Sequence, residues 1–108
     1  MSSMDFQDLD FVFTDEATGT AQSYDGGDAT LQITAGAWST GTASVQVSFD
    51  GGTRYVAMKD INSNALTTLS ADAMYNISLG PCLIRVVVAT ATITTGQMTI
   101  DTARHGIS

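Results

Sequence analysis

Short runs of alternating apolar and polar residues recur along the chain. In residues 42–49, Thr, Ser and Gln occupy one face of an extended chain, and the other face consists of Ala43, Val45, Val47 and Phe49. Residues 97–103 repeat the pattern with Met98 and Ile100. Because the side chains of a strand point alternately to two faces, this period predicts strands with one buried face and one solvated face.

Seven such runs are separated by short segments rich in Gly, Asn, Asp and Pro, which favour tight turns. Residues 19–24 are a candidate eighth strand. The seven ranges are 9–14, 29–34, 42–49, 53–59, 73–79, 82–90 and 97–103. Their close, regular spacing predicts an all-β fold: an antiparallel β-sandwich of about seven or eight short strands, either Ig-like or jelly-roll.

One of these runs differs from the others. Residues 82–90 are apolar on both faces apart from Arg85. Strands with two apolar faces are usually covered on both sides. We therefore predict that residues 82–90 form a central strand, or one that a partner covers.

Length and charge narrow the possible functions. The 108 residues fit one domain, residues 1–108, and the net charge is −7. Binding to nucleic acid requires clustered Lys and Arg that contact phosphates. The basic residues are few and scattered, at Arg54, Lys59, Arg85 and Arg104. We expect no nucleic-acid partner.

Side chains that usually carry catalysis or bind metals are sparse. Cys82 and His105 are the only cysteine and histidine, too few for a zinc site. Asp25 and Asp28 could offer two carboxylates to a hard cation, but they do not match a calcium loop, and a solvated Asp-rich turn is the favoured interpretation. We expect no enzymatic activity, no catalytic residue, no metal site and no cofactor.

The chain also lacks the usual signals for export or membrane insertion. Residues 1–10 contain neither the basic nor the apolar region of a signal peptide. No apolar run approaches the ~20 residues that a spanning helix needs. We expect synthesis in a cytoplasm and no membrane partner.

The segment Asp50, Gly51 and Gly52 lies between two alternating runs. Paired glycines at this place favour a hairpin, because the tight turns of hairpins need positive φ angles. A ligand loop would need more converging polar groups than Asp50 and Thr53. The sequence therefore predicts a structural corner.

Two registers are open for this hairpin. A two-residue loop places Val47 opposite Val56. A three-residue loop with a bulge instead turns Tyr55 and Ala57 toward the core. The sequence does not choose between them.

The N-terminal segment is rich in large apolar side chains. We predict an arm within residues 1–14 that docks on a neighbouring chain, with its anchors at Phe6, Leu9, Phe11 and Phe13. Buried aromatic side chains are common hot spots of such contacts. The alternative is that the same residues form the first strand of the core.

Trp38 lies between two glycine-bearing turns. Its favoured role is to cap one end of the sandwich core. The alternative is a glycan platform, in which Trp38 would line a loop-end site with Asp25, Asp28 and Tyr55.

Two stretches carry a resemblance to a known family. The segments GAWSTGTASVQVSFDGGTRYVAM and LGPCLIRVVV resemble small β-sandwich proteins of tailed-phage virions over roughly residues 29–103. Tyr55 stands where that family often has Trp. The matching residues are Gly36, Trp38, Ser48, Asp50, Gly51, Gly52, Thr53, Tyr55, Gly80, Arg85, Val86 and Val88.

This resemblance implies a non-enzymatic structural protein of a phage particle, made in the bacterial cytoplasm and located in the virion. The expected role is capsid decoration, in which a homo-oligomer stabilises the shell by bridging subunits of the major capsid protein. Alternatives are a head-fibre, neck or tail component that contacts other virion proteins. A small carbohydrate- or receptor-binding module is the rival outside this family.

Overall fold

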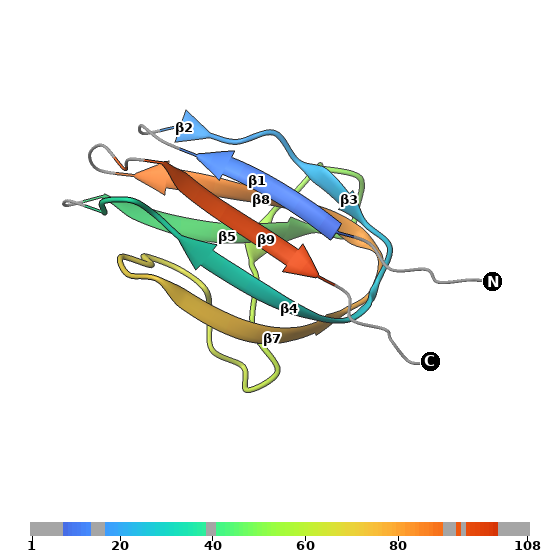
Figure 1. Cartoon of the computed structure of the whole chain (residues 1–108). Helices are drawn as coiled ribbons and strands as arrows, with labels where there is room; N and C mark the ends of the chain where they lie inside the picture. Colours follow the sequence, from blue (N-terminus) through green and yellow to red (C-terminus); the bar gives the residue numbers. More distant parts are fainter. Residues whose placement is uncertain (1–7, 14–16, 39–40, 90–92, 94, 102–108) are drawn as a thin grey trace.

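The computed structural model describes residues 8–13, 17–38, 41–89, 93 and 95–101. It consists of two antiparallel sheets stacked as a sandwich, and the described residues contain no helix (Figure 1). The predicted all-β sandwich is therefore confirmed.

Four strands form the first sheet, in the spatial order β1 (Asp8–Phe13), β9 (Gly96–Asp101), β4 (Gly27–Thr34) and β7 (Ala73–Leu79). In the second sheet, two short strands pair with one edge of β8 (Cys82–Ala89), and they are β2 (Ala17–Thr18) and β3 (Gln22–Tyr24). The other edge of β8 pairs with β5 (Thr42–Ser48), which in turn pairs with β6 (Val56–Ala57).

The strand order identifies the sandwich as a jelly roll. If β2 and β3 are counted together as the second strand, the sheets have the orders first–eighth–third–sixth and second–seventh–fourth–fifth. A hairpin of eight strands that is rolled onto itself gives this arrangement. In an immunoglobulin-like sandwich the first two strands are neighbours in one sheet, whereas here they lie in different sheets. The strand order thus decides between the two predicted architectures.

A single register runs through the corner where the rolled ribbon passes from one sheet to the other. Tyr24 is opposite Cys82 in the second sheet, and Gly27 is opposite Leu79 in the first, so the two ladders continue one another. At this corner the backbone of Gly26 passes close to Pro81. Gly26 has a φ of 98°, and a Cβ atom added to it would lie only 3.0 Å from Pro81 Cδ. A side chain here would be strained and would clash.

The inward side chains of both sheets form one core. β8 is central in its sheet, as predicted, and it contributes the buried Ile84, Val86 and Val88. Its opposite face carries the half-buried Leu83, Arg85 and Val87.

Two residues near the end of β5 depart from the predicted alternation. Phe49 was expected on the core face but is 60% exposed, and Ser48 was expected in water but is 1% exposed. β5 ends at Ser48 and the chain bends there. The strand alternation therefore stops one residue before Phe49.

The predicted strand at residues 53–59 shrinks to Val56–Ala57. The following segment takes over part of the β5 edge: the backbone N–H groups of Ala43 and Val45 donate to the carbonyls of Leu69 and Leu66, both over 2.9 Å. The N–H of Ile61 donates over 3.0 Å to the carbonyl of Asn76 on β7. This segment therefore makes backbone bonds to both sheets, which limits free pairing at their edges.

The predicted N-terminal arm is wrong for three of its four anchors. Leu9, Phe11 and Phe13 lie on β1 and are only 5–7% exposed within the domain's own core. Side chains that are buried in this way have no surface left for a neighbour, so the alternative of a first core strand holds. Phe6 lies outside the described residues.

Replacement of Phe11 by Ala tests this placement. We expect Phe11→Ala to lower the free energy of unfolding by about 3–5 kcal/mol, because it leaves a cavity in the core. The matched control is Val12→Ala, because Val12 is the next residue in the chain and is 77% exposed. This control should change the free energy of unfolding by no more than about 0.5 kcal/mol. Urea denaturation followed by circular dichroism measures both. Equal, small effects would contradict the core placement of β1.

Candidate functional site

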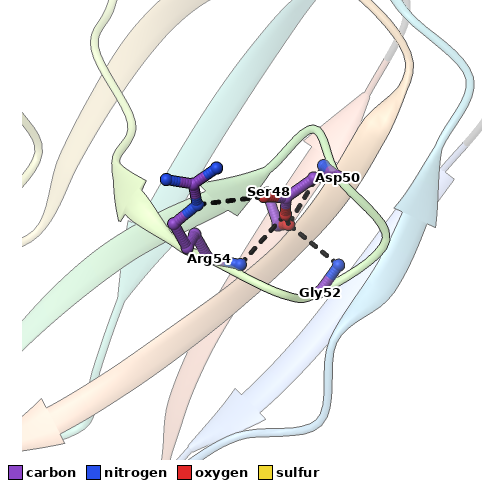
Figure 2. A network of polar contacts seen from close by, with 4 residues as sticks. All are labelled: Ser48, Asp50, Gly52 and Arg54. Carbon is purple, nitrogen blue, oxygen red and sulfur yellow. Dashed lines mark hydrogen bonds and ion pairs between the residues drawn. The ribbon is translucent and has the colours of Figure 1, made fainter.

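The Asp50 corner is held by a compact network of polar contacts (Figure 2). Asp50 Oδ1 accepts hydrogen bonds from Ser48 Oγ over 2.7 Å and from the backbone N–H of Arg54 over 2.9 Å. Ser48 Oγ accepts one from the backbone N–H of Gly52 over 2.9 Å. Arg54 Nε lies 3.4 Å from Asp50 Oδ2. Both carboxylate oxygens thus serve the loop that carries them.

The ladder beyond the corner selects one of the two registers. Val47 is opposite Val56 and Gln46 is opposite Ala57, which is the register of the shorter loop. The alternative with Tyr55 and Ala57 turned toward the core is wrong. Gly51 and Gly52 both have positive φ, at 74° and 95°, as the predicted turn requires.

These hydrogen bonds lower the pKa of Asp50 below its ordinary 3.8, with the backbone N–H of Arg54 as the largest cause and the Ser48 hydroxyl as the second. Each bond favours the charged carboxylate. The network therefore fits the predicted structural corner rather than a ligand loop.

Asp50→Asn tests this role through its pH dependence. A carboxyl group with a lowered pKa in the folded state stabilises the protein above about pH 4, and this stabilisation is lost as the pH falls through the folded-state pKa. We expect the variant to have a lower free energy of unfolding than the native protein at neutral pH. This difference should shrink as the pH falls below about 4. Urea denaturation along a pH series measures it. The control, Asp28→Asn, removes an exposed carboxylate from the first sheet; a loss as large in the control would contradict a specific role of the corner.

An exposed apolar groove lies beside this corner. Val47, Phe49, Asp50, Arg54 and Val56 line it, and its volume is about 300 Å³. Phe49 and Val56 are 60% and 58% exposed, and the Arg54 side chain is 85% exposed. Apolar side chains gathered on a surface in this way mark places where another molecule can bind. We call Phe49, Arg54, Val56 and the following Lys59 the hairpin edge.

Sequence reasoning missed this groove. In the sequence, Phe49 and Val56 occupy ordinary strand positions. They are exposed only because β5 ends early and β6 is short. The available signal was local. The glycine pair follows Phe49 almost at once, which leaves little room for the strand to continue.

Tyr55, the aromatic residue after the corner, lies on the outer face of the second sheet. The guanidinium of Arg85 stacks 3.6 Å from the centre of its ring, and Arg85 Nε donates to Gln46 Oε1 over 2.8 Å. A cation–π contact of this kind is worth about 0.5–1 kcal/mol at an exposed site. Tyr55 thus fixes the only arginine of β8.

Trp38 packs against the core at the opposite end of the sandwich, as its predicted capping role requires. Its ring centre lies 6.2 Å from that of Phe13. Its Nε1–H donates to Asp72 Oδ1 over 2.9 Å, and the same oxygen accepts the N–H of Ala35 over 3.1 Å. The indole is therefore fixed on both its apolar and its polar side.

The predicted loop-end site does not assemble. Trp38 follows β4 and Asp25 precedes it, and a strand of eight residues extends about 25 Å. The connections therefore lie at opposite ends of the sandwich (Figure 1). Asp28 lies on the first sheet, whereas Tyr55 stacks on Arg85 of the second sheet. Four residues so distributed cannot bind one ligand.

Asp60 forms a second polar corner that sequence reasoning had not singled out. Its Oδ1 accepts the backbone N–H groups of Asn62 and Asn64, each over 2.9 Å, and its Oδ2 accepts Asn64 Nδ2 over 3.2 Å. The N–H of Asn64 is the largest cause of a lowered Asp60 pKa. The signal was the D-x-N-x-N spacing, which matches the start of a calcium loop but lacks its glycine and its distal glutamate.

Within the described ranges, no three His, Cys, Asp or Glu side chains gather in a group that could hold a metal ion. In the same residues no helix has the length and apolar character needed to cross a membrane. Cys82 is half-buried, and burial raises the pKa of its thiol, which disfavours the reactive thiolate.

Comparison with known proteins found no matching family model, no matching curated protein and no matching solved structure.

Proposed function

We propose that this protein is a non-enzymatic structural component of a phage particle that decorates and stabilises the capsid shell. In this role it binds the major capsid protein or another virion protein as a homo-oligomer, after synthesis in the bacterial cytoplasm. A head-fibre, neck or tail position is the alternative within the same particle.

The observation that carries the proposal is the groove of the hairpin edge. Ser48, Asp50 and Gly52 of the S-x-D-G-G-T stretch that resembles the phage family form the internal network of the Asp50 corner together with Arg54. This network holds a hairpin on which Phe49 and Val56 remain exposed. Val12 and Met74 are exposed too, but they lie on strands at opposite edges of the first sheet, whereas Phe49 and Val56 line one groove. A protein that docks on a shell would bury such a pair there.

Two further features support the proposal. Jelly rolls occur in capsid proteins, although also in lectins and cupins, so the fold alone assigns no function. The net charge of −7 suits a protein on the outside of a particle, since it disfavours contact with the packaged genome.

Quantitative mass spectrometry of purified particles tests the proposal. We expect this chain in numbers comparable to the major capsid protein, whereas a small fixed number would indicate a vertex, neck or tail. An abundant host protein controls for contamination. Absence of the chain from washed particles would overturn the proposal.

A pair of variants tests the groove itself. We expect Phe49→Ser to reduce occupancy on particles at least tenfold, a loss of about 1.4 kcal/mol in binding. The matched control is Ile61→Ser, which removes a side chain of similar exposure, 57%, from another surface. Equal occupancy of the two variants would exclude the groove as the contact.

A further inference from the structure

A pocket on the outer face of the first sheet lies away from the hairpin edge, and its volume is about 280 Å³. Two strands and one loop line it, namely β4, β7 and the loop that follows β6. The lining residues are Asp28, Ala29, Thr30, Ile61, Asn76 and Ile77. Ala29 and Ile77 are buried in the core, and the side chains of a strand alternate between its two faces. The polar side chains of Asp28, Thr30 and Asn76 therefore surround the opening. We call this hollow the β4–β7 pocket.

Ile61 forms an apolar wall of this pocket at the edge of the sheet. Its N–H donates over 3.0 Å to the carbonyl of Asn76, and its side chain is 57% exposed. The loop that carries Ile61 is also held from within, because Asp60 Oδ1 accepts the N–H groups of Asn62 and Asn64. The wall is thus in place before a ligand arrives, which lowers the entropy cost of binding.

The polar groups of the pocket offer hydrogen bonds of both kinds. A carboxylate accepts, an amide nitrogen donates, and a hydroxyl group does both. Within the described ranges, no hydrogen bond or ion pair occupies the Asp28 carboxylate or Asn76 Nδ2. Thr30 Oγ1 lies 3.5 Å from Asn76 Oδ1, a weak contact that a ligand can replace. A ligand that fits the pocket therefore donates and accepts within the width of one small molecule.

We propose that the β4–β7 pocket binds one ring of a neutral glycan. Hydroxyl groups of the ring would donate to the Asp28 carboxylate and accept from Asn76 Nδ2, and the C–H face of the ring would lie on Ile61. A volume of about 280 Å³ is small for a ligand pocket. It suits a single ring rather than a larger ligand.

Other classes of ligand match fewer of these groups. An anion would face the carboxylate of Asp28, and no Lys or Arg lines the pocket. A metal ion needs several strong ligands, and among the described residues no three His, Cys, Asp or Glu side chains gather. An organic ammonium group would donate to Asp28 but could not accept from Asn76 Nδ2.

The surface beside the pocket can contact further units of a glycan chain. On the same outer face, Asp101 lies opposite Thr30, and Gln32 lies opposite Thr99. These side chains also donate and accept hydrogen bonds. The inference stands apart from the phage proposal, because the groove of the hairpin edge is formed by β5, β6 and the corner between them in the second sheet.

Titration of the native protein with methyl glycosides tests the site. The probes are the methyl glycosides of glucose, galactose, mannose and N-acetylglucosamine, and amide NMR signals are followed. Each is added to about 100 mM, because the expected Kd of so small a ligand is on the order of millimolar. At least one probe should shift the signals of Thr30, Ile61 and Asn76 to saturation and leave that of Val56 in place. No saturable shift at these residues with any probe would overturn the proposal. Binding of a free sugar without binding of its methyl glycoside would exclude a glycan chain as the ligand.

Variants of exposed residues separate this site from its surroundings. Asn76→Ala and Ile61→Ser should each weaken binding of the glycoside at least tenfold. The matched control is Val12→Ala, on the far edge strand of the same sheet, which should bind as the native protein does. An equal loss in the control would overturn the proposal, and so would tighter binding of butylammonium than of any glycoside. Ile61→Ser should keep its occupancy on phage particles and Phe49→Ser should keep its glycoside binding, so the two proposals fail independently.

Discussion

The register of one antiparallel ribbon governs this structure. The ladders of β3 with β8 and of β4 with β7 must meet across the corner between the two sheets without a slip, because a slip by one residue would turn every core side chain outward. Tyr24 anchors this corner: it is 1% exposed and its hydroxyl donates over 2.7 Å to the carbonyl of Gly27. The register is also kept where the ribbon passes between the sheets a second time, because the ladder of β4 with β9 and the ladder of β5 with β8 continue one another.

The hydrogen bonds of the Asp50 corner act on the neighbouring surface indirectly, because they fix the shape of the hairpin. Ser48 is buried and satisfied by its neighbours, so the chain turns sharply and leaves Phe49 outside. The Asp50 carboxylate and the Ser48 hydroxyl are occupied within the loop. The effect of this network is to stiffen a hairpin whose exposed side chains can contact another protein.

The two faces of the sandwich differ in chemistry although they share one core. The first sheet presents Asp, Thr and Gln, and the second presents Arg85 with its aromatic and amide partners. In a jelly roll, consecutive strands of the chain usually alternate between sheets. Arg54 and Lys59 flank β6, and β5 pairs with both β6 and β8, which carries Arg85. The pairing of these three strands brings the described cations to one sheet.

The sequence by itself determined the strands and most of their faces, because alternation at β5 and β9 and the apolar run at β8 reflect burial directly. It also determined that Asp50, Gly51 and Gly52 form a corner, since glycine pairs at that place have few other uses. The tertiary structure alone decided the order of the strands, the placement of Leu9, Phe11 and Phe13 in the core, the separation of Trp38 from Asp25, and the exposure of Val56. These features depend on which distant strands pair and on where each ladder ends, and such long-range contacts leave no period in the local pattern of residues.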